Sequence, residues 1–188
     1  EGRAIRRGFI ATSGYSLVSI DYSQIDLRMA AILSKDTHLI DIFRNGEDVH
    51  SGVAARVFGV PEEAVDREMR RRAKVINFGI LYGMGVNALR TNLGAEATRA
   101  EAQSFLNAYF NTFTRLAEYL EETKTFAREN GYTETLFGRR RFFPNINTTA
   151  SHLRAQQERM AINAPIQGTA ADVVRIAMNR VYAFIKKE

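Results

Sequence analysis

Four side chains suited to nucleotide binding recur at a spacing of four residues in the stretch 70–83. They are Arg70, Lys74, Phe78 and Tyr82. A four-residue step nearly matches one helical turn, so on an α-helix they form a single drifting row about 18 Å long. Two cations followed by two rings match the order of phosphates and base in a nucleoside triphosphate, and the helix dipole favours anions at the cationic end. The row predicts a nucleotide-binding helix, and an ordinary solvent-exposed basic helix is the alternative.

A carboxylate at position 21 is the best candidate for a metal ligand. Asp21 follows the apolar run 17–20, which predicts a short buried strand. Ser23 and Asp26 resemble a capping box, so we expect a helix over about 24–33. Asp21 would then lie where a strand leads into a helix, and Mg²⁺ usually takes one or two carboxylates together with phosphate oxygens. The alternative is an aspartate that merely ends a strand.

Composition limits the class of protein. The 188 residues suit one domain or pieces of two, and the absence of cysteine excludes disulfides and thiolate metal sites. A net charge of +5 suits a polyanionic partner. Because the sequence has no long apolar run and no apolar signal core at its start, we expect no membrane span and no secretory peptide. We therefore expect a cytoplasmic protein, and a monomer.

The remaining pattern predicts helices joined by short loops, with one hairpin. Asp36 and Thr98 are expected to begin helices, and Gly131 to end one. The expected elements are an extended segment at 3–10, helices at about 37–43, 49–58, 98–110 and 116–130, a helical turn at 62–65, a hairpin at 132–143, and two helices, 151–162 and 169–186, separated near Pro165.

Several stretches resemble motifs of family-A DNA polymerases, of the bacterial DNA polymerase I type. Residues 21–28 (DYSQIDLR) resemble motif A, and residues 70–83 (RRRAKVINFGILYG) resemble motif B. Residues 135–141 (TLFGRRR) and 159–172 (RMAINAPIQGTAAD) resemble the segments that follow motif B. Their order and spacing match over essentially the whole chain.

The resemblance implies an α+β, mainly helical fold that forms part of a right-hand polymerase. Residues 1–35 would belong to a partial palm with short antiparallel strands and motif A. Residues 36–130 would form the helical fingers, with the motif B helix at about 66–83. Residues 131–188 would return to the palm as a hairpin and two helices, and the chain would end before motif C, the His-Asp-Glu hairpin that carries the second metal-binding aspartate.

The resemblance also implies template-directed DNA synthesis, in which two Mg²⁺ ions assist transfer of a deoxynucleotide to a primer. Primer–template DNA and deoxynucleoside triphosphates would be the partners. The implied metal ligands are Asp21 and the carbonyl of Tyr22, and the implied catalytic residues are Asp21 and Lys74. The implied nucleotide-binding residues are Gln24, Asp26, His50, Arg70, Lys74, Phe78 and Tyr82. The implied DNA-binding residues are Arg141, Arg159, Asn163 and Gln167, partly through the minor groove, whose acceptors are shared by all base pairs.

Departures from the family pattern, in single residues and in completeness, change what is expected of this chain. Asp26 stands where the family usually has Glu at the gate that excludes ribonucleotides, so either the gate is looser or the backbone compensates. Arg72 adds a third consecutive arginine, for which we expect no catalytic role. Because motif C is missing, the 188 residues alone are expected to polymerise little or nothing.

Two other interpretations remain open from the sequence. The first is a non-catalytic nucleic-acid-binding module that uses residues 139–143 and the basic helix. The second is a relative of single-subunit RNA polymerases, which Asp26 and the run 78–83 disfavour.

Overall fold

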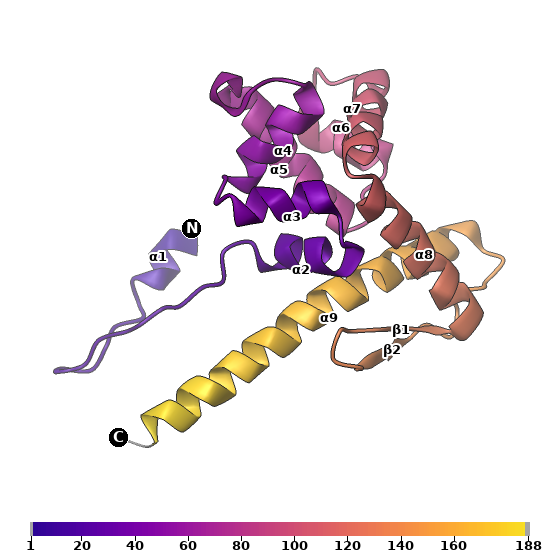
Figure 1. Cartoon of the computed structure of the whole chain (residues 1–188). Coiled ribbons are helices and arrows are strands. Elements are labelled where there is room, and N and C mark those ends of the chain that lie inside the picture. The colour runs from indigo at the N-terminus through magenta and orange to yellow at the C-terminus, as the bar shows by residue number, and fades with distance from the viewer. Residues whose placement is uncertain (1, 187–188) are drawn as a thin grey trace.

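The protein is described by a computed structural model over residues 2–186, which form a mainly helical body with one small hairpin (Figure 1). The helices are α1 (Gly2–Arg6), α2 (Ile25–Ser34), α3 (Thr37–Arg44), α4 (Val49–Phe58), the 3₁₀ turn η1 (Glu62–Ala64), α5 (Arg67–Leu81), α6 (Val86–Leu93), α7 (Arg99–Thr112), α8 (Thr114–Asn130) and α9 (Ser151–Ile185). The strands β1 (Tyr132–Glu134) and β2 (Arg140–Phe142) form an antiparallel pair.

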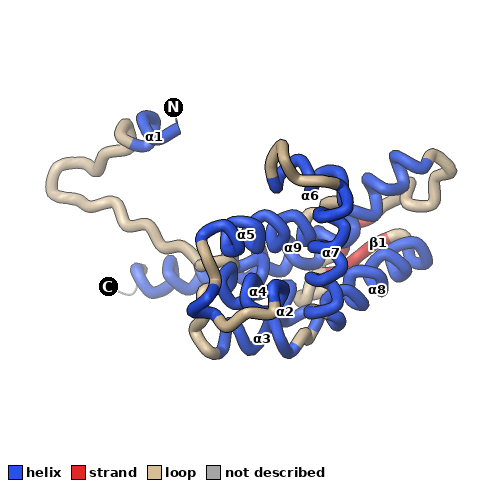
Figure 2. The backbone as a smooth tube through the Cα atoms, turned by 90° about the horizontal axis from the view of Figure 1, so that it is seen from above, coloured by secondary structure: helices blue, strands red, loops and turns tan. Residues whose placement is uncertain are grey.

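Helix α9 is the base on which the other elements are arranged. Helices α2 and α8 pack against it, and α3 to α7 rise from this base as a helical layer (Figure 1). Seen from above, α5 and α4 run side by side, as their contacts confirm (Figure 2). The main core draws apolar side chains from all of these helices, including Leu27, Leu39, Val53, Ile76, Leu116 and Ile166. The predicted α+β, mainly helical architecture is confirmed.

Helix ends follow the signals that the sequence carries locally. The side chains of Asp36, Asp48 and Asp66 each accept a hydrogen bond from a backbone N–H in the first turn of α3, α4 and α5. Thr98 and Glu101 form a reciprocal capping box at the start of α7. Gly131 ends α8 with a left-handed φ of 73°, which glycine adopts without steric cost.

The hairpin is attached to α9 through polar side chains of the turn that follows β1. The Thr135 hydroxyl donates to the Asp172 carboxylate at 2.8 Å, and the Arg139 guanidinium donates to the same carboxylate at 3.0 Å. The Thr169 hydroxyl accepts from the Leu136 amide at 3.0 Å. Gly168 lies so close that a Cβ there would meet the Thr135 methyl carbon at 2.5 Å. The stretches 135–141 and 159–172 are therefore hydrogen-bonded to each other, and Arg139 forms an ion pair with Asp172.

Three expectations for the first 24 residues are wrong. The extended segment at 3–10 begins instead as α1, and residues 17–20 form no strand, with Val18 and Ile20 about four-fifths exposed (80% and 81%). A strand needs a neighbouring backbone to hydrogen-bond, and within residues 2–186 no segment pairs with 17–20. The helix after Asp21 is confirmed as α2, but Ser23 does not cap it. Gln24 occupies the N-cap position in a left-handed conformation without a side-chain cap bond.

The expected break at Pro165 is also wrong, because α9 is one helix of 35 residues with Pro165 inside it. Proline removes one intrahelical hydrogen bond and usually ends or kinks a helix. Here Ala161, Ile162, Pro165 and Ile166 are buried beneath other elements, so tertiary packing holds the helix together through the proline. No helix in residues 2–186 combines the length and apolar character needed to cross a lipid bilayer.

Candidate functional site

Helix α5 presents the predicted row to solvent because its opposite side is buried. Ile76 and Ile80 are in the core, whereas Lys74, Phe78 and Tyr82 are exposed. These three side chains line one hollow of about 280 Å³, together with Arg71, Val75, Gly79, Met84 and Asn92. The structure therefore brings one cation and both rings of the row onto a single concave surface.

A glycine is needed at position 79, in the last turn of α5, because another part of the chain approaches it closely. A Cβ at this position would lie 2.7 Å from the sulfur of Met84, which is too close for any real contact. The Met84 amide also donates to the Gly79 carbonyl at 2.8 Å, so the chain folds back tightly after the helix. The residue that approaches Gly79 closely is therefore Met84, which also lines the hollow.

Arg70, at the cationic end of the row, is held by a carboxylate from α4. Its Nε and Nη2 donate to the two carboxylate oxygens of Asp48, each at 3.0 Å. Burial by itself would raise the pKa of Asp48, but hydrogen bonds from Arg70 and from Ser51 outweigh it and lower the pKa to about 2. The pair is therefore fully charged at neutral pH.

His50 lies on α4, behind Phe78, with 4% of its surface exposed. The Asn77 amide nitrogen lies 3.1 Å from its Nδ1, and the His50 and Phe78 ring centroids are 5.8 Å apart. Burial lowers the pKa of His50; Asp48 opposes this, and the charges of Arg70 and Lys74 reinforce it. With the amide in this orientation Nδ1 accepts, so the proton of the neutral ring is on Nε2.

Tyr82, at the aromatic end of the row, contacts the motif A stretch. Its hydroxyl donates to the Asp26 carboxylate at 3.4 Å, which joins the end of α5 to the first turn of α2. Burial and the Asp26 charge raise the pKa of Tyr82, while the Gln167 side chain acts in the opposite direction. Gln24 lies just before α2 and is half-buried. The structure thus brings together three of the predicted site residues from α2, α5 and α9.

Asp21 and Tyr22 lie on the exposed segment that leads into α2, and neither forms an ion pair or a hydrogen bond with α5 within residues 2–186. Among residues 2–186, no group of three or more histidine, aspartate or glutamate side chains is arranged so that it could hold a metal ion. Asp21 therefore supplies one accessible carboxylate five residues before Asp26. The geometry leaves its metal-binding role as a prediction.

The four predicted DNA-binding residues lie on β2 and α9. Arg141 is exposed on β2, with its guanidinium 5.5 Å from the centre of the Phe143 ring. Arg159 is also exposed, and its stem packs against Gly83. Asn163 is half-buried, and its side-chain oxygen has no hydrogen-bond partner within residues 2–186; Gln167 is exposed one turn further along α9. Three of the four therefore follow one another along a single helix.

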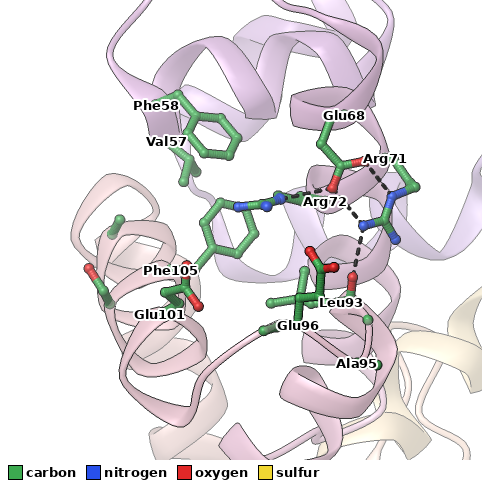
Figure 3. Close-up of a pocket in the computed structure, with 14 residues that line it drawn as sticks. Val57, Phe58, Glu68, Arg71, Arg72, Leu93, Ala95, Glu96, Glu101 and Phe105 are labelled. Atoms are coloured by element: carbon green, nitrogen blue, oxygen red, sulfur yellow. Dashed lines mark hydrogen bonds and ion pairs between the residues drawn. The ribbon is translucent and has the colours of Figure 1, made fainter.

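A larger hollow of about 640 Å³ lies between α4, α5 and α7, where Arg71 and Arg72 reach the same carboxylate (Figure 3). Glu68 accepts from Arg71 at 2.6 and 2.7 Å and from Arg72 at 3.0 Å. Arg71 also donates to the Leu93 carbonyl at 2.8 Å. Arg72 is thus paired with Glu68 within the helix, and its lack of a catalytic role stays a prediction.

Sequence reasoning missed two residues that support the row. Asp48 was missed because nothing in the sequence pairs it with Arg70, which lies 22 residues later on another helix. Asn77 was missed because its contact with His50 spans 27 residues. The sequence did offer one signal for Asn77, because it is a polar residue beside the apolar positions expected to be buried, and a buried polar side chain needs a partner.

Comparison with known proteins finds relatives of one kind, which are DNA polymerases. The family model described as DNA polymerase family A matches residues 1–188. The thermostable DNA polymerase I of Thermus thermophilus is 46% identical over 186 residues, and the DNA polymerase I of Pseudomonas aeruginosa is 49% identical over 178 residues. The alignments cover 99% and 95% of this chain but 22% and 19% of those proteins, so the chain spans about a fifth of their length.

A solved structure is similar throughout. The POL domain of Pol1 from M. smegmatis, in complex with DNA primer-template and dNTP, superposes with a TM-score of 0.90 at 41% identity, covering 99% of this chain and 33% of that one. The predicted resemblance is confirmed by these matches, which cover the chain from end to end. The chain therefore belongs to DNA polymerase family A.

Proposed function

We propose that the protein carrying this chain synthesises DNA on a template, adding deoxynucleotides to the 3′ end of a primer. The observation that supports this most directly is the exposed flank of α5. It carries Lys74, Phe78 and Tyr82 on one hollow, and the Tyr82 hydroxyl lies 3.4 Å from Asp26. This arrangement joins the two stretches whose resemblance implies nucleotide binding. A similar polymerase domain has been solved with DNA primer-template and dNTP, which supports the same substrates here.

The incoming nucleotide would lie along α5 with its triphosphate at the end nearer Arg70. Arg70 and Lys74 would bind the phosphate oxygens, and Lys74 would neutralise charge that develops on the departing pyrophosphate. His50, neutral and protonated on Nε2, would donate a further hydrogen bond to a phosphate. Phe78 would pack against the sugar and base, and Tyr82 would stack at the templating position.

Asp21 and the Tyr22 carbonyl are the donors proposed for magnesium. Mg²⁺ prefers oxygen ligands and is often bound by one or two carboxylates plus substrate phosphates, so an exposed carboxylate next to a backbone carbonyl fits this ion in chemical type. When bound, two such ions supply stabilisation of the attacking and leaving oxygens. Residues 2–186 gather no larger cluster of metal-binding side chains, so further ligands would come from the nucleotide and from other parts of the protein.

The primer–template duplex would lie along the exposed side of α9 and β2. Arg141 and Arg159 would contact phosphates or the minor groove, and Asn163 and Gln167 would donate to minor-groove acceptors. The Gln167 side chain also lowers the pKa of the Tyr82 hydroxyl through a hydrogen bond, so the two side chains are neighbours. This supports a position for the end of the duplex close to the templating base. Such contacts would test the shape of a base pair without reading its identity.

Asp26 is proposed to contribute to sugar selection with a shorter reach than glutamate. Its carboxylate meets the Tyr82 hydroxyl at 3.4 Å, which is long for a hydrogen bond between oxygens. We propose that the space beside the sugar 2′ position is therefore closed less tightly than in relatives with Glu.

The proposed division of the chain assigns residues 1–35 and 131–188 to the palm and residues 36–130 to the fingers. We propose that these 188 residues alone extend a primer little or not at all, because Asp21 is the one carboxylate assigned to the metals. Robust extension by the isolated chain would contradict this.

Asp21→Ala in the full-length protein tests the proposal. Extension of a labelled primer should fall by about 10³-fold or more, the scale of losing a group that stabilises transition-state charge. Asp41→Ala, on the exposed side of α3, is the matched control and should leave extension unchanged. Affinity for primer–template, measured by fluorescence anisotropy, should persist in both variants. If the protein were instead a non-catalytic nucleic-acid-binding module, it would bind DNA, and Asp21→Ala would cause no loss of primer extension.

A further inference from the structure

Asp48 has two distinct partners, and the second is not explained by its place in the chain. As the N-cap of α4, its Oδ1 accepts from the Ser51 amide at 2.9 Å. The same carboxylate also accepts two parallel hydrogen bonds from Arg70 on α5, from Nε at 3.0 Å and from Nη2 at 3.0 Å. A helix cap needs only one oxygen and no cation, so the bidentate pair is an additional feature.

The pair fixes the direction of Arg70. Nε and Nη2 are occupied, which leaves the Nη1 edge of the planar guanidinium available to a ligand. Both side chains remain partly exposed, at 47% for Arg70 and 39% for Asp48, so the pair lies at the surface of the site. An arginine in this setting would otherwise move among many rotamers, and binding would have to order it.

Lys74, one turn further along, is arranged differently. Within residues 2–186 no carboxylate pairs with it, so its ammonium keeps its whole charge for a ligand. The two cations of the row therefore have different properties. The Lys74 ammonium has no carboxylate beside it within residues 2–186. The Arg70 guanidinium is held in one orientation by Asp48, whose negative charge partly balances its own.

We propose that Asp48 is a positioning residue that holds Arg70 in the orientation needed to bind the nucleotide triphosphate. This inference rests on the proposed function of Arg70 as a phosphate ligand. Asp48 touches no reacting atom, and its effect on nucleotide binding is exerted through Arg70. Loss of the carboxylate frees the guanidinium, so nucleotide affinity falls although Arg70 is still present.

Asp48→Ser in the full-length protein separates the two roles. Serine is as good an N-cap as aspartate, so α4 keeps its first-turn hydrogen bond while the bidentate partner of Arg70 is lost. The change also leaves His50 neutral, because Asp48 is the group that favours the charged ring. Asp66→Ser is the matched control, since Asp66 caps α5 through the Met69 amide and has no cationic partner in residues 2–186.

The measurement is single-turnover primer extension over a range of dNTP concentrations, which gives an apparent Kd and a maximal rate. Asp48→Ser should raise the apparent Kd by about fivefold to tenfold, the effect of having to order one long side chain on binding. The maximal rate should stay within about twofold. Asp66→Ser should change neither value, and both variants should have equal melting temperatures.

The double variant distinguishes positioning from a general structural effect. If Asp48 acts through Arg70, then Asp48→Ser adds nothing to Arg70→Ala, and the two changes are non-additive. An unchanged or tighter apparent Kd in Asp48→Ser, or full additivity with Arg70→Ala, overturns the inference. If Arg70→Ala itself leaves the apparent Kd unchanged, the proposed role of Arg70 fails instead.

Discussion

Replacing Asp36 should weaken two helices that are far apart in the sequence. Its Oδ1 accepts from the Leu39 amide in the first turn of α3 at 3.1 Å, and its Oδ2 accepts from the Leu116 amide in the first turn of α8 at 3.1 Å. Asp36 is 2% exposed, and both leucines are fully buried. One carboxylate therefore caps α3 and joins it to α8.

The cost of Asp36→Ala follows from these two bonds. Loss of an N-cap costs about 1 kcal/mol. Leaving the second buried amide without its charged acceptor costs about 1.5–3 kcal/mol. The two costs sum to about 2.5–4 kcal/mol, which corresponds to about 100-fold to 1,000-fold in the equilibrium of an opening that exposes both first turns together. Asp36→Ser should recover the cap of α3 and leave α8 weakened, because one hydroxyl cannot reach both amides.

Amide hydrogen exchange of the full-length protein, followed by mass spectrometry, measures these openings segment by segment. In Asp36→Ala, exchange through openings that expose both first turns together should accelerate by about 100-fold or more at the starts of α3 and α8. Asp66→Ala, which removes an exposed single cap, should accelerate the start of α5 by only about fivefold. Unchanged exchange at the start of α8 in Asp36→Ala would refute the reasoning, because it would reduce Asp36 to a local cap.

Three further predictions follow from single contacts. The pKa of His50 is lowered below 6.5 by burial, so as the pH falls the unfolded chain binds a proton before the folded chain does. The melting temperature should therefore fall as the pH drops below about 6.5, and His50→Gln should lose this pH dependence. Gly168→Ala should destabilise the protein by about 1–3 kcal/mol because its methyl would overlap Thr135, and adding Thr135→Ser should restore much of the melting temperature. Asp26→Glu should strengthen discrimination against ribonucleotides in primer extension; discrimination that does not change would refute the looser gate.

The elements predicted best from the sequence are those whose signals lie within one helical turn. Asp36, Thr98 and Gly131 mark helix ends through bonds that span three or four residues, so local spacing reveals them. The bond from Asp36 to Leu116 spans 80 residues and depends on how α3 meets α8. No local pattern encodes such a contact.

The failures share one cause, which is that tertiary surroundings outweigh local preference. The apolar run 17–20 favours a strand, yet within residues 2–186 it has no neighbouring backbone and stays exposed. Pro165 favours a helix end, yet burial of the surrounding turns keeps α9 continuous. Local sequence reports what a segment can form, while its neighbours decide what it does form.

The candidate site was predictable where it lies on one helix and unpredictable where it joins two. The four-residue spacing of Arg70, Lys74, Phe78 and Tyr82 predicted a row, and the structure shows three of its members on one hollow. The Asp48 partner of Arg70 comes from a different helix, so it emerged only from the folded arrangement.

The central claim is that Asp21 and the exposed flank of α5 hold one deoxynucleotide between them on a metal ion. The most direct test is a crystal structure of the full-length protein with primer–template and an incoming nucleotide, in which Mn²⁺ is located by its anomalous scattering. The account predicts a metal peak about 2 Å from the Asp21 carboxylate, with triphosphate oxygens running from the metal to Lys74. A peak bound elsewhere, with Asp21 free or the triphosphate away from Lys74, would contradict it.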